Sequence, residues 1–145
     1  MERPARLRRR VSALLEAMRL AVRVEMALRR SDFAVVLHEI DTTPAAPAAR
    51  FTDIPAQTFE RAIAVAYRLL PFKPSCLKTS LVFLLYRRRR GLPAELRIGV
   101  QKRADALTAH AWVEDGNGGV LTDPQLGFSS MPPLAPRDGS SAASD

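Results

Sequence analysis

The sequence predicts an α+β fold in which helices come first and a small antiparallel sheet follows. Up to residue 90, apolar residues recur at three- and four-residue steps, which is the period of amphipathic helices. After Gly91 the period changes to two, as in half-buried strands. With 145 residues, 47% of them hydrophobic, the chain has the length for one domain around a single modest core.

Residues 1–40 are predicted to form a basic helical region. Arginines occupy much of one side of its first helix, residues 5–30, and the other side carries an apolar stripe made of Leu7, Val11, Leu14, Met18 and Val22. This helix packs on the domain, docks a partner or lies on a membrane surface. The formal net charge of +7 favours an acidic partner, such as nucleic acid, an anionic membrane or an acidic peptide, unless the basic runs are only solvated faces.

No segment of the sequence predicts a cleaved signal or stable insertion into a membrane. Arg19, Arg23 and Glu25 interrupt the candidate apolar stretch near the N-terminus, and nowhere does the chain reach the roughly 18 uncharged apolar residues of a membrane span. The single cysteine cannot form an intramolecular disulfide, which fits a reducing compartment. We therefore expect a cytoplasmic protein.

The rest of the chain divides into three parts. Residues 41–50 form a predicted linker, because two prolines interrupt any helix there. Residues 51–128 form the predicted core domain, which begins with a helix near Pro55 that ends before Pro71. Residues 129–145 are rich in Ser, Pro, Ala and Asp and predict a disordered tail.

A helix is predicted to start at Cys76, with Ser75 as its cap. Its buried stripe consists of Leu77, Leu81, Leu84 and Leu85. Four arginines, residues 87–90, follow this stripe, and Gly91 supplies a left-handed stop. The arginine run either complements the negative end of the helix dipole or grips an acidic ligand. Three strands are then predicted, at residues 96–101, 107–114 and 120–123.

Cys76 is the candidate nucleophile. At the first turn of a helix, free N–H groups and the positive end of the dipole favour a thiolate and are able to hold an oxyanion. A structural cysteine fits more naturally in the middle of the apolar stripe, although a lone cysteine is often a small buried hydrophobe. Since one Cys and two distant His are a poor ligand set, we expect no metal, and no cofactor is implied.

His110 is the candidate base and Asp123 the candidate group that orients it. Only His38 competes as a base, and it lies in an amphipathic segment beside the linker. His110 lies on the less apolar face of its strand, so it is expected to face a cleft. If the following loop has an even number of residues, Asp123 shares that face with His110; an odd-numbered loop or a bulge turns it away. Asp123 is otherwise a turn residue before a proline, and Glu114 is too far along the same strand to replace it.

Cysteine at a helix start, histidine on a strand and aspartate on the next strand resemble the transglutaminase-like superfamily of papain-type cysteine enzymes. The run LPFKPSCLKTSLVFLLYRRRRGLPAELRIGV, followed by AHAWVE, resembles more narrowly the B-type leader peptidases of lasso-peptide biosynthesis. This resemblance covers roughly residues 57–126. Lys78 and Thr79 differ from the residues common in such relatives, which affects the expected substrate contacts and not the chemistry.

The resemblance implies a papain/transglutaminase-like fold, in which the nucleophile helix packs on the small sheet. It implies that Cys76 is the nucleophile, His110 the base and then the acid, and Asp123 the orienting residue. Such enzymes remove the leader from a precursor peptide, and a separate lasso cyclase then closes the macrolactam ring. Many such enzymes are split into two proteins, a peptidase and a small leader-recognition protein. The chain has no room for a leader-recognition module before its first helices, so we expect a separate leader-recognition protein as partner. The basic N-terminal helix is the expected docking surface.

Two other functions are compatible with the sequence. The first is a different transglutaminase-like reaction, such as amide crosslinking or general proteolysis. The second is a non-catalytic basic module that binds nucleic acid or membrane. Few aromatic residues accompany the arginines, so a stacking platform for single strands is poorly supported and no nucleic-acid partner is expected.

Overall fold

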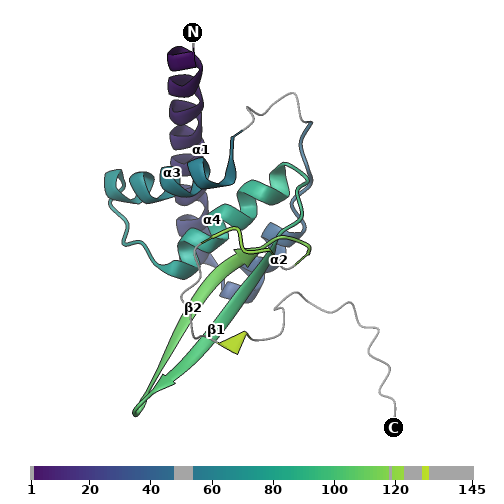
Figure 1. Cartoon of the computed structure of the whole chain (residues 1–145). Helices are drawn as coiled ribbons and strands as arrows, with labels where there is room; N and C mark the ends of the chain where they lie inside the picture. Colours follow the sequence, from purple (N-terminus) through teal and green to yellow (C-terminus); the bar gives the residue numbers. More distant parts are fainter. Residues whose placement is uncertain (1, 48–53, 118, 123–128, 131–145) are drawn as a thin grey trace.

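A computed structural model confirms the α+β fold (Figure 1). It describes residues 2–47, 54–117, 119–122 and 129–130. The helices are α1 (Glu2–Arg30), α2 (Phe33–Asp41), α3 (Ala56–Leu69) and α4 (Cys76–Arg89). The strands are β1 (Glu95–Arg103), β2 (Ala106–Glu114) and β3 (Ser129–Ser130), in the sheet order β2-β1-β3.

Helix α4 is the centre of the molecule. It packs against α1, α2 and α3 and against both long strands, and every residue from 80 to 86 is buried. The leucine stripe predicted from the sequence is therefore only part of its contact surface. A helix that is covered on all sides has no solvent-facing stripe, and its sequence correspondingly lacks strong amphipathic periodicity.

Aromatic side chains join α4 to α3. The rings of Phe59 and Tyr86 stack with centroids 3.6 Å apart, and the Phe83 ring lies 5.8 Å from that of Tyr86. The Tyr86 hydroxyl donates a hydrogen bond to the carbonyl oxygen of Ile54 at 3.0 Å, so its polar end is satisfied inside the core. These contacts fix α3 against the second half of α4, beyond the turn that carries Cys76.

The face that α1 presents to the core differs from the predicted stripe. Its buried side is made of Ala13, Ala17, Leu20, Ala21 and Val24. Small alanine side chains let two helices approach closely, which explains why this face and not the bulkier one packs against α3 and α4. Leu7, Val11 and Val22 of the predicted stripe remain 63%, 48% and 37% exposed.

Two members of the arginine run at the C-terminal end of α4, Arg88 and Arg90, are paired within the fold and do not form an open basic patch. Arg88 pairs with Asp41 at 3.1 Å, and Arg90 makes two hydrogen bonds to the Glu16 carboxylate at 2.7 and 2.8 Å. The Arg90 guanidinium also lies over the Tyr86 ring, 3.9 Å from its centroid. These contacts hold the end of α4 against α1 and α2, so much of the run serves the fold.

The left-handed stop predicted at Gly91 is confirmed. Gly91 has φ of +65°, its N–H donates to the carbonyl of Arg88, and the N–H of Leu92 donates to that of Arg87. This pair of bonds is the Schellman arrangement, which satisfies the last carbonyls of a helix. The chain thereby turns directly from α4 into β1.

The third strand differs from its prediction. Within residues 119–122, pairing with β2 is limited to one bridge, between Glu114 and Val120. The third strand of the sheet is instead β3, where Ser130 and Ser129 pair with Gly99 and Val100. Ser129–Ser130 belongs to the segment predicted as a disordered tail, and residues 131–145 lie outside the described residues.

We expect Glu16→Ala to lower the free energy of unfolding by about 3 kcal/mol, because it leaves the Arg90 guanidinium buried without its carboxylate. The paired side chains are only 8% and 13% exposed. Urea denaturation followed by circular dichroism measures the effect. Glu2→Ala is the matched control, since the Glu2–Arg6 pair is 84% and 72% exposed and its loss is expected to cost less than about 0.5 kcal/mol. Equal effects of the two substitutions would contradict a buried Arg90–Glu16 tie.

Candidate active site

Cys76 is the first residue of α4, as the sequence predicts. Ser75 caps the helix, because its hydroxyl oxygen accepts a hydrogen bond from the N–H of Lys78 at 3.1 Å. The Thr79 hydroxyl donates to the carbonyls of Ser75 and Cys76, which further fixes this turn. The Cys76 side chain is half-buried and free of any disulfide. A nucleophile in this position has the first-turn N–H groups beside it as oxyanion donors.

His110 lies in the middle of β2, directly across from Gly99 of β1. Its ring is 6.2 Å from that of Trp112, two residues further along the same face, and the two planes are only 22° apart. The indole N–H of Trp112 donates to the Glu114 carboxylate at 2.9 Å, which anchors the ring that His110 packs against. Because Gly99 has no side chain, nothing from the opposite position on β1 crowds the imidazole.

Cys76 and His110 line the same cavity, of about 180 Å³. Helix α4 contributes Cys76, Thr79 and Ser80 to the lining, β2 contributes His110 and Ala111, and the remaining residues are Glu60, Ile63, Ala64 and Thr122. The fold thus brings together a thiol and an imidazole that are 34 positions apart in the sequence. The volume suits one or two side chains of a peptide better than a complete small-molecule ligand.

Ser80 ties the two halves of this site together. Its hydroxyl donates a hydrogen bond to the carbonyl oxygen of Ala111 at 3.1 Å, in a buried position. Ser80 is one helical turn after Cys76, and Ala111 follows His110, so one bond links the helix of Cys76 to the strand of His110. In the sequence, Ser80 was visible only as a serine four residues after the cysteine, which does not reveal its partner.

Glu60 and Thr122 are further lining residues that the sequence did not single out. Glu60 comes from α3, and its carboxylate is the only acidic side chain among the described residues that line the cavity. The sequence barely marks Glu60 as a site residue, because only the fold shows that the face of the helix with Glu60, Ile63 and Ala64 meets the cavity. Thr122 accepts a hydrogen bond from the N–H of Val113 at 2.9 Å, which holds the end of the β2 loop near the cavity.

The even-numbered loop considered for the His110–Asp123 pairing is wrong. The bridge between Glu114 and Val120 encloses five residues, 115–119. The Asp115 side chain causes this length, because its Oδ1 accepts hydrogen bonds from the N–H groups of Asn117 and Gly119, each at 2.8 Å. An odd-numbered loop removes the strand-pairing argument that placed Asp123 on the same face as His110. Asp123 itself lies outside the described residues, so its role as the orienting residue stays a prediction that rests on the family resemblance.

Lys78 is occupied by a structural contact. Its ammonium group lies 2.9 Å from the carboxylate of Glu25, a buried residue of α1. The pair therefore fastens the first turn of α4 to α1, close to the cysteine. Nearby, the Tyr67 hydroxyl is buried with no hydrogen-bond partner among the described residues, and burial, with a smaller contribution from Glu25, raises the pKa of Tyr67 to about 12.

A family model described as the transglutaminase-like superfamily matches residues 14–134 of this chain. The match includes α3, α4, both long strands and the cavity that they enclose. No curated protein and no solved structure is significantly similar to the chain.

Two kinds of feature are absent from the residues that the structure describes. None of their helices has both the length and the apolar character needed to cross a membrane. Within the same residues, no three His, Cys, Asp or Glu side chains gather in a way that suits a metal ion.

We expect His110→Ala to slow alkylation of Cys76 by iodoacetamide at neutral pH by about tenfold or more, because the imidazole no longer accepts the thiol proton. Cys76 is the only cysteine, so intact-protein mass spectrometry reports its reaction directly. His38→Ala is the matched control, since His38 is the only other histidine and is exposed on α2. Equal rates for the His110 and His38 variants would show that the imidazole does not act on the thiol.

Tyr67→Phe is expected to leave the free energy of unfolding at pH 7 unchanged or slightly higher, because it removes a buried hydroxyl that has no hydrogen-bond partner among the described residues. In the folded protein the pKa of Tyr67 is raised to about 12, above its usual value of 10.0. Ionisation of Tyr67 therefore leaves the free energy of unfolding of the wild type intact below pH 10. This free energy falls as the pH rises toward 12, by about 1 kcal/mol between pH 9 and pH 11. Urea denaturation across this range should show a loss in the wild type that the variant lacks, and parallel losses would contradict the raised pKa.

Proposed function

This chain belongs to the transglutaminase-like superfamily, and we propose that it is a cysteine peptidase that removes the leader from a lasso-peptide precursor. Members of the superfamily generally act as cysteine proteases or acyltransferases, so the family indicates chemistry of this type. The observation that carries the proposal is the placement of Cys76 and His110 on one cavity, between a capped helix start and a strand. The narrower assignment to leader removal is supported by the motifs around these two residues.

The proposed reaction is acyl transfer from the leader to water. The Cys76 sulfur attacks the carbonyl carbon of the last peptide bond of the leader, and His110 takes the thiol proton. The imidazolium then gives this proton to the leaving amine, which becomes the N-terminus of the core peptide. In the second step His110 takes a proton from water as that water attacks the thioester, and the leader leaves as a carboxylic acid while the Cys76 thiol is restored.

Three features assist these steps in the proposal. The first-turn N–H groups of α4 stabilise the oxyanion, because the helix dipole adds to their hydrogen bonds. Asp123 orients the imidazole through its second nitrogen, as the resemblance to the family implies. Ser80 supports both steps indirectly, since its bond to Ala111 keeps the thiol and imidazole on the same cavity.

The partners in this proposal follow from the reaction. A separate leader-recognition protein presents the precursor, and a lasso cyclase uses the freed amine to close the macrolactam ring. Consistent with a separate recognition protein, α1 and α2 pack on the same core as α4 instead of forming a recognition module of their own. We place the reaction in the cytoplasm, where a lone thiol remains reduced.

The test is mass spectrometry of a leader–core peptide incubated with this protein and its recognition protein. We expect the wild type to cut one bond at the end of the leader, and Cys76→Ala to reduce the rate by about a thousandfold or more, because the nucleophile is lost. Cleavage by both proteins would remove Cys76 from the mechanism. A product joined to an added amine would indicate another acyl transferase, and no reaction with a recognition protein shown to bind the leader would contradict the peptidase.

A further inference from the structure

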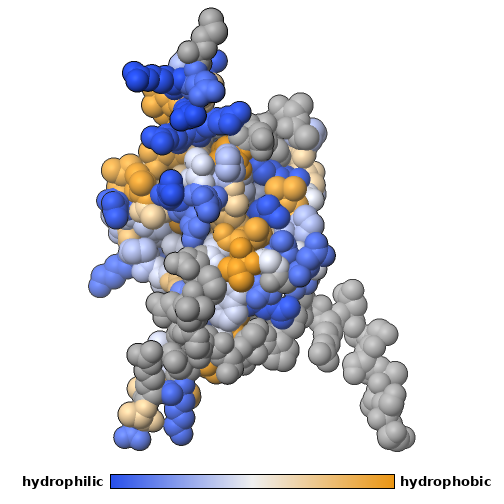
Figure 2. Space-filling view, in the orientation of Figure 1, coloured by the Kyte–Doolittle hydropathy of each residue, from blue (hydrophilic) through white to orange (hydrophobic). Residues whose placement is uncertain are grey.

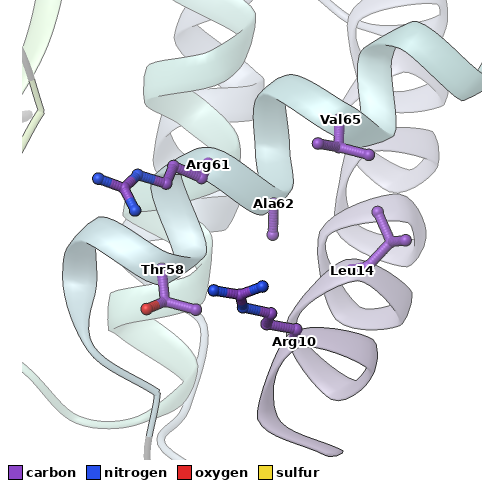
Figure 3. A pocket seen from close by; sticks show the side chains of 6 residues that line it. All are labelled: Arg10, Leu14, Thr58, Arg61, Ala62 and Val65. Atoms are coloured by element: carbon purple, nitrogen blue, oxygen red, sulfur yellow. The ribbon is translucent and has the colours of Figure 1, made fainter. Parts of the chain in front are cut away.

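The face of α3 that points away from the candidate active site borders a second, larger cavity. It has a volume of about 390 Å³ and is lined by Arg10 and Leu14 of α1 and by Thr58, Arg61, Ala62 and Val65 of α3. We call these six residues the α1/α3 groove. In Figure 3 the Arg10 side chain reaches from α1 across the gap toward Thr58, and Ala62 points into the space between the helices.

The floor of the groove continues into exposed apolar surface. Leu7 and Val11 precede Leu14 by seven and three residues, so the three side chains form one ridge along about 10 Å of α1. Leu7 is 63% exposed, and on α3 Val65 and Leu69 are 40% and 60% exposed. Figure 2 shows hydrophobic surface over the end of α3 beside the hydrophilic surface of the protruding part of α1. Such a continuous patch is typical of an interaction site.

Positive charge surrounds this apolar surface. Neither Arg10 nor Arg61 forms a salt bridge within the part of the chain that the structure describes, and the same is true of Arg3 and Arg8. This contrasts with Arg88 and Arg90, whose guanidinium groups are paired with carboxylates inside the fold. The groove thus offers unpaired guanidinium groups beside an apolar floor.

We propose that the α1/α3 groove binds an acidic amphipathic helix of a partner polypeptide. Apolar residues of that helix at three- and four-residue steps pack on Leu7, Val11 and Leu14, and its flanking carboxylates pair with Arg10 and Arg61. A second copy of this chain fits poorly, because its own groove would bring arginines against arginines. A membrane-bound helix lies flat on the lipid surface, whereas this site is recessed between two helices.

The α1/α3 groove and the cavity of Cys76 and His110 share helix α3, but binding in the groove takes no part in the peptidase reaction. Thr58, Arg61, Ala62 and Val65 line the groove, and Glu60, Ile63 and Ala64 line the cavity of Cys76 and His110. The two sets lie on opposite faces of α3. A helix bound in the groove therefore leaves the catalytic cavity open.

The test uses a fluorescein-labelled helical peptide of about 15 residues, four turns long, with leucines at three- and four-residue steps and glutamates elsewhere. Fluorescence anisotropy with the full chain should show saturable binding. The double variant Arg10→Glu with Arg61→Glu should raise the Kd by about tenfold or more, because carboxylates then face carboxylates. The matched control, Arg9→Glu with Arg23→Glu, makes the same change in net charge at exposed positions outside the groove and should raise the Kd by less than about threefold.

Several results would overturn the proposal. They are no saturable binding of the glutamate peptide, equal binding of a peptide with lysines in place of glutamates, or equal losses in the two double variants. Sedimentation with phosphatidylserine–phosphatidylcholine vesicles that requires Arg10 and Arg61, without peptide binding, would assign the surface to a membrane. Since all four arginines are exposed, circular dichroism should show the same fold in each variant.

Discussion

The burial of helix α4 on all sides is the constraint on which the rest of the structure depends. Three helices and two strands pack around it, so its position is determined from every direction. Its first residue is Cys76 and its last turn is held by paired arginines. A helix fixed at both ends holds Cys76, the proposed nucleophile, at a defined place, which is what a reaction with a precise attack geometry needs.

The second half of the site depends on how the sheet is joined to this helix. Ser80 links α4 to Ala111 by a buried hydrogen bond, and the apolar side chains of Ala111 and Val113 are buried in the core. His110, which directly precedes Ala111 in the strand, is only half-buried and lines the cavity. The period of two in a strand thus serves both purposes, because neighbouring residues anchor the strand and present the imidazole.

The basic character of the chain has two separate physical meanings. Arginines at the end of α4 are neutralised within the fold by Asp41 and Glu16, so they contribute to net charge without forming an open basic surface. Arginines near the start of α1 lie on a helix that extends beyond the packed core (Figure 1), where all residues from 2 to 11 are exposed. Composition alone cannot separate these two groups of arginines, since it counts charges and does not show which of them are paired.

Sequence reasoning succeeded where local chemistry decides the structure. The cap at Ser75, the helix start at Cys76 and the stop at Gly91 each depend on a few adjacent residues. It failed where tertiary packing decides, as for the alanine face of α1, whose burial depends on the close approach of other helices. The sequence left the length of the loop after β2 open because it depends on the Asp115 side chain, and Glu60 was missed because only the fold brings α3 to the cavity.

The central claim is that the Cys76 thiol and the His110 imidazole face each other across one cavity. Reaction of the folded protein with the bifunctional alkylating agent 1,3-dibromoacetone, followed by digestion and peptide mapping, tests this geometry directly. The account predicts that Cys76 reacts first and that the second bromomethyl group then joins it to a nitrogen of His110. A crosslink from Cys76 to a different residue, or alkylation of Cys76 that never closes onto His110, would contradict it.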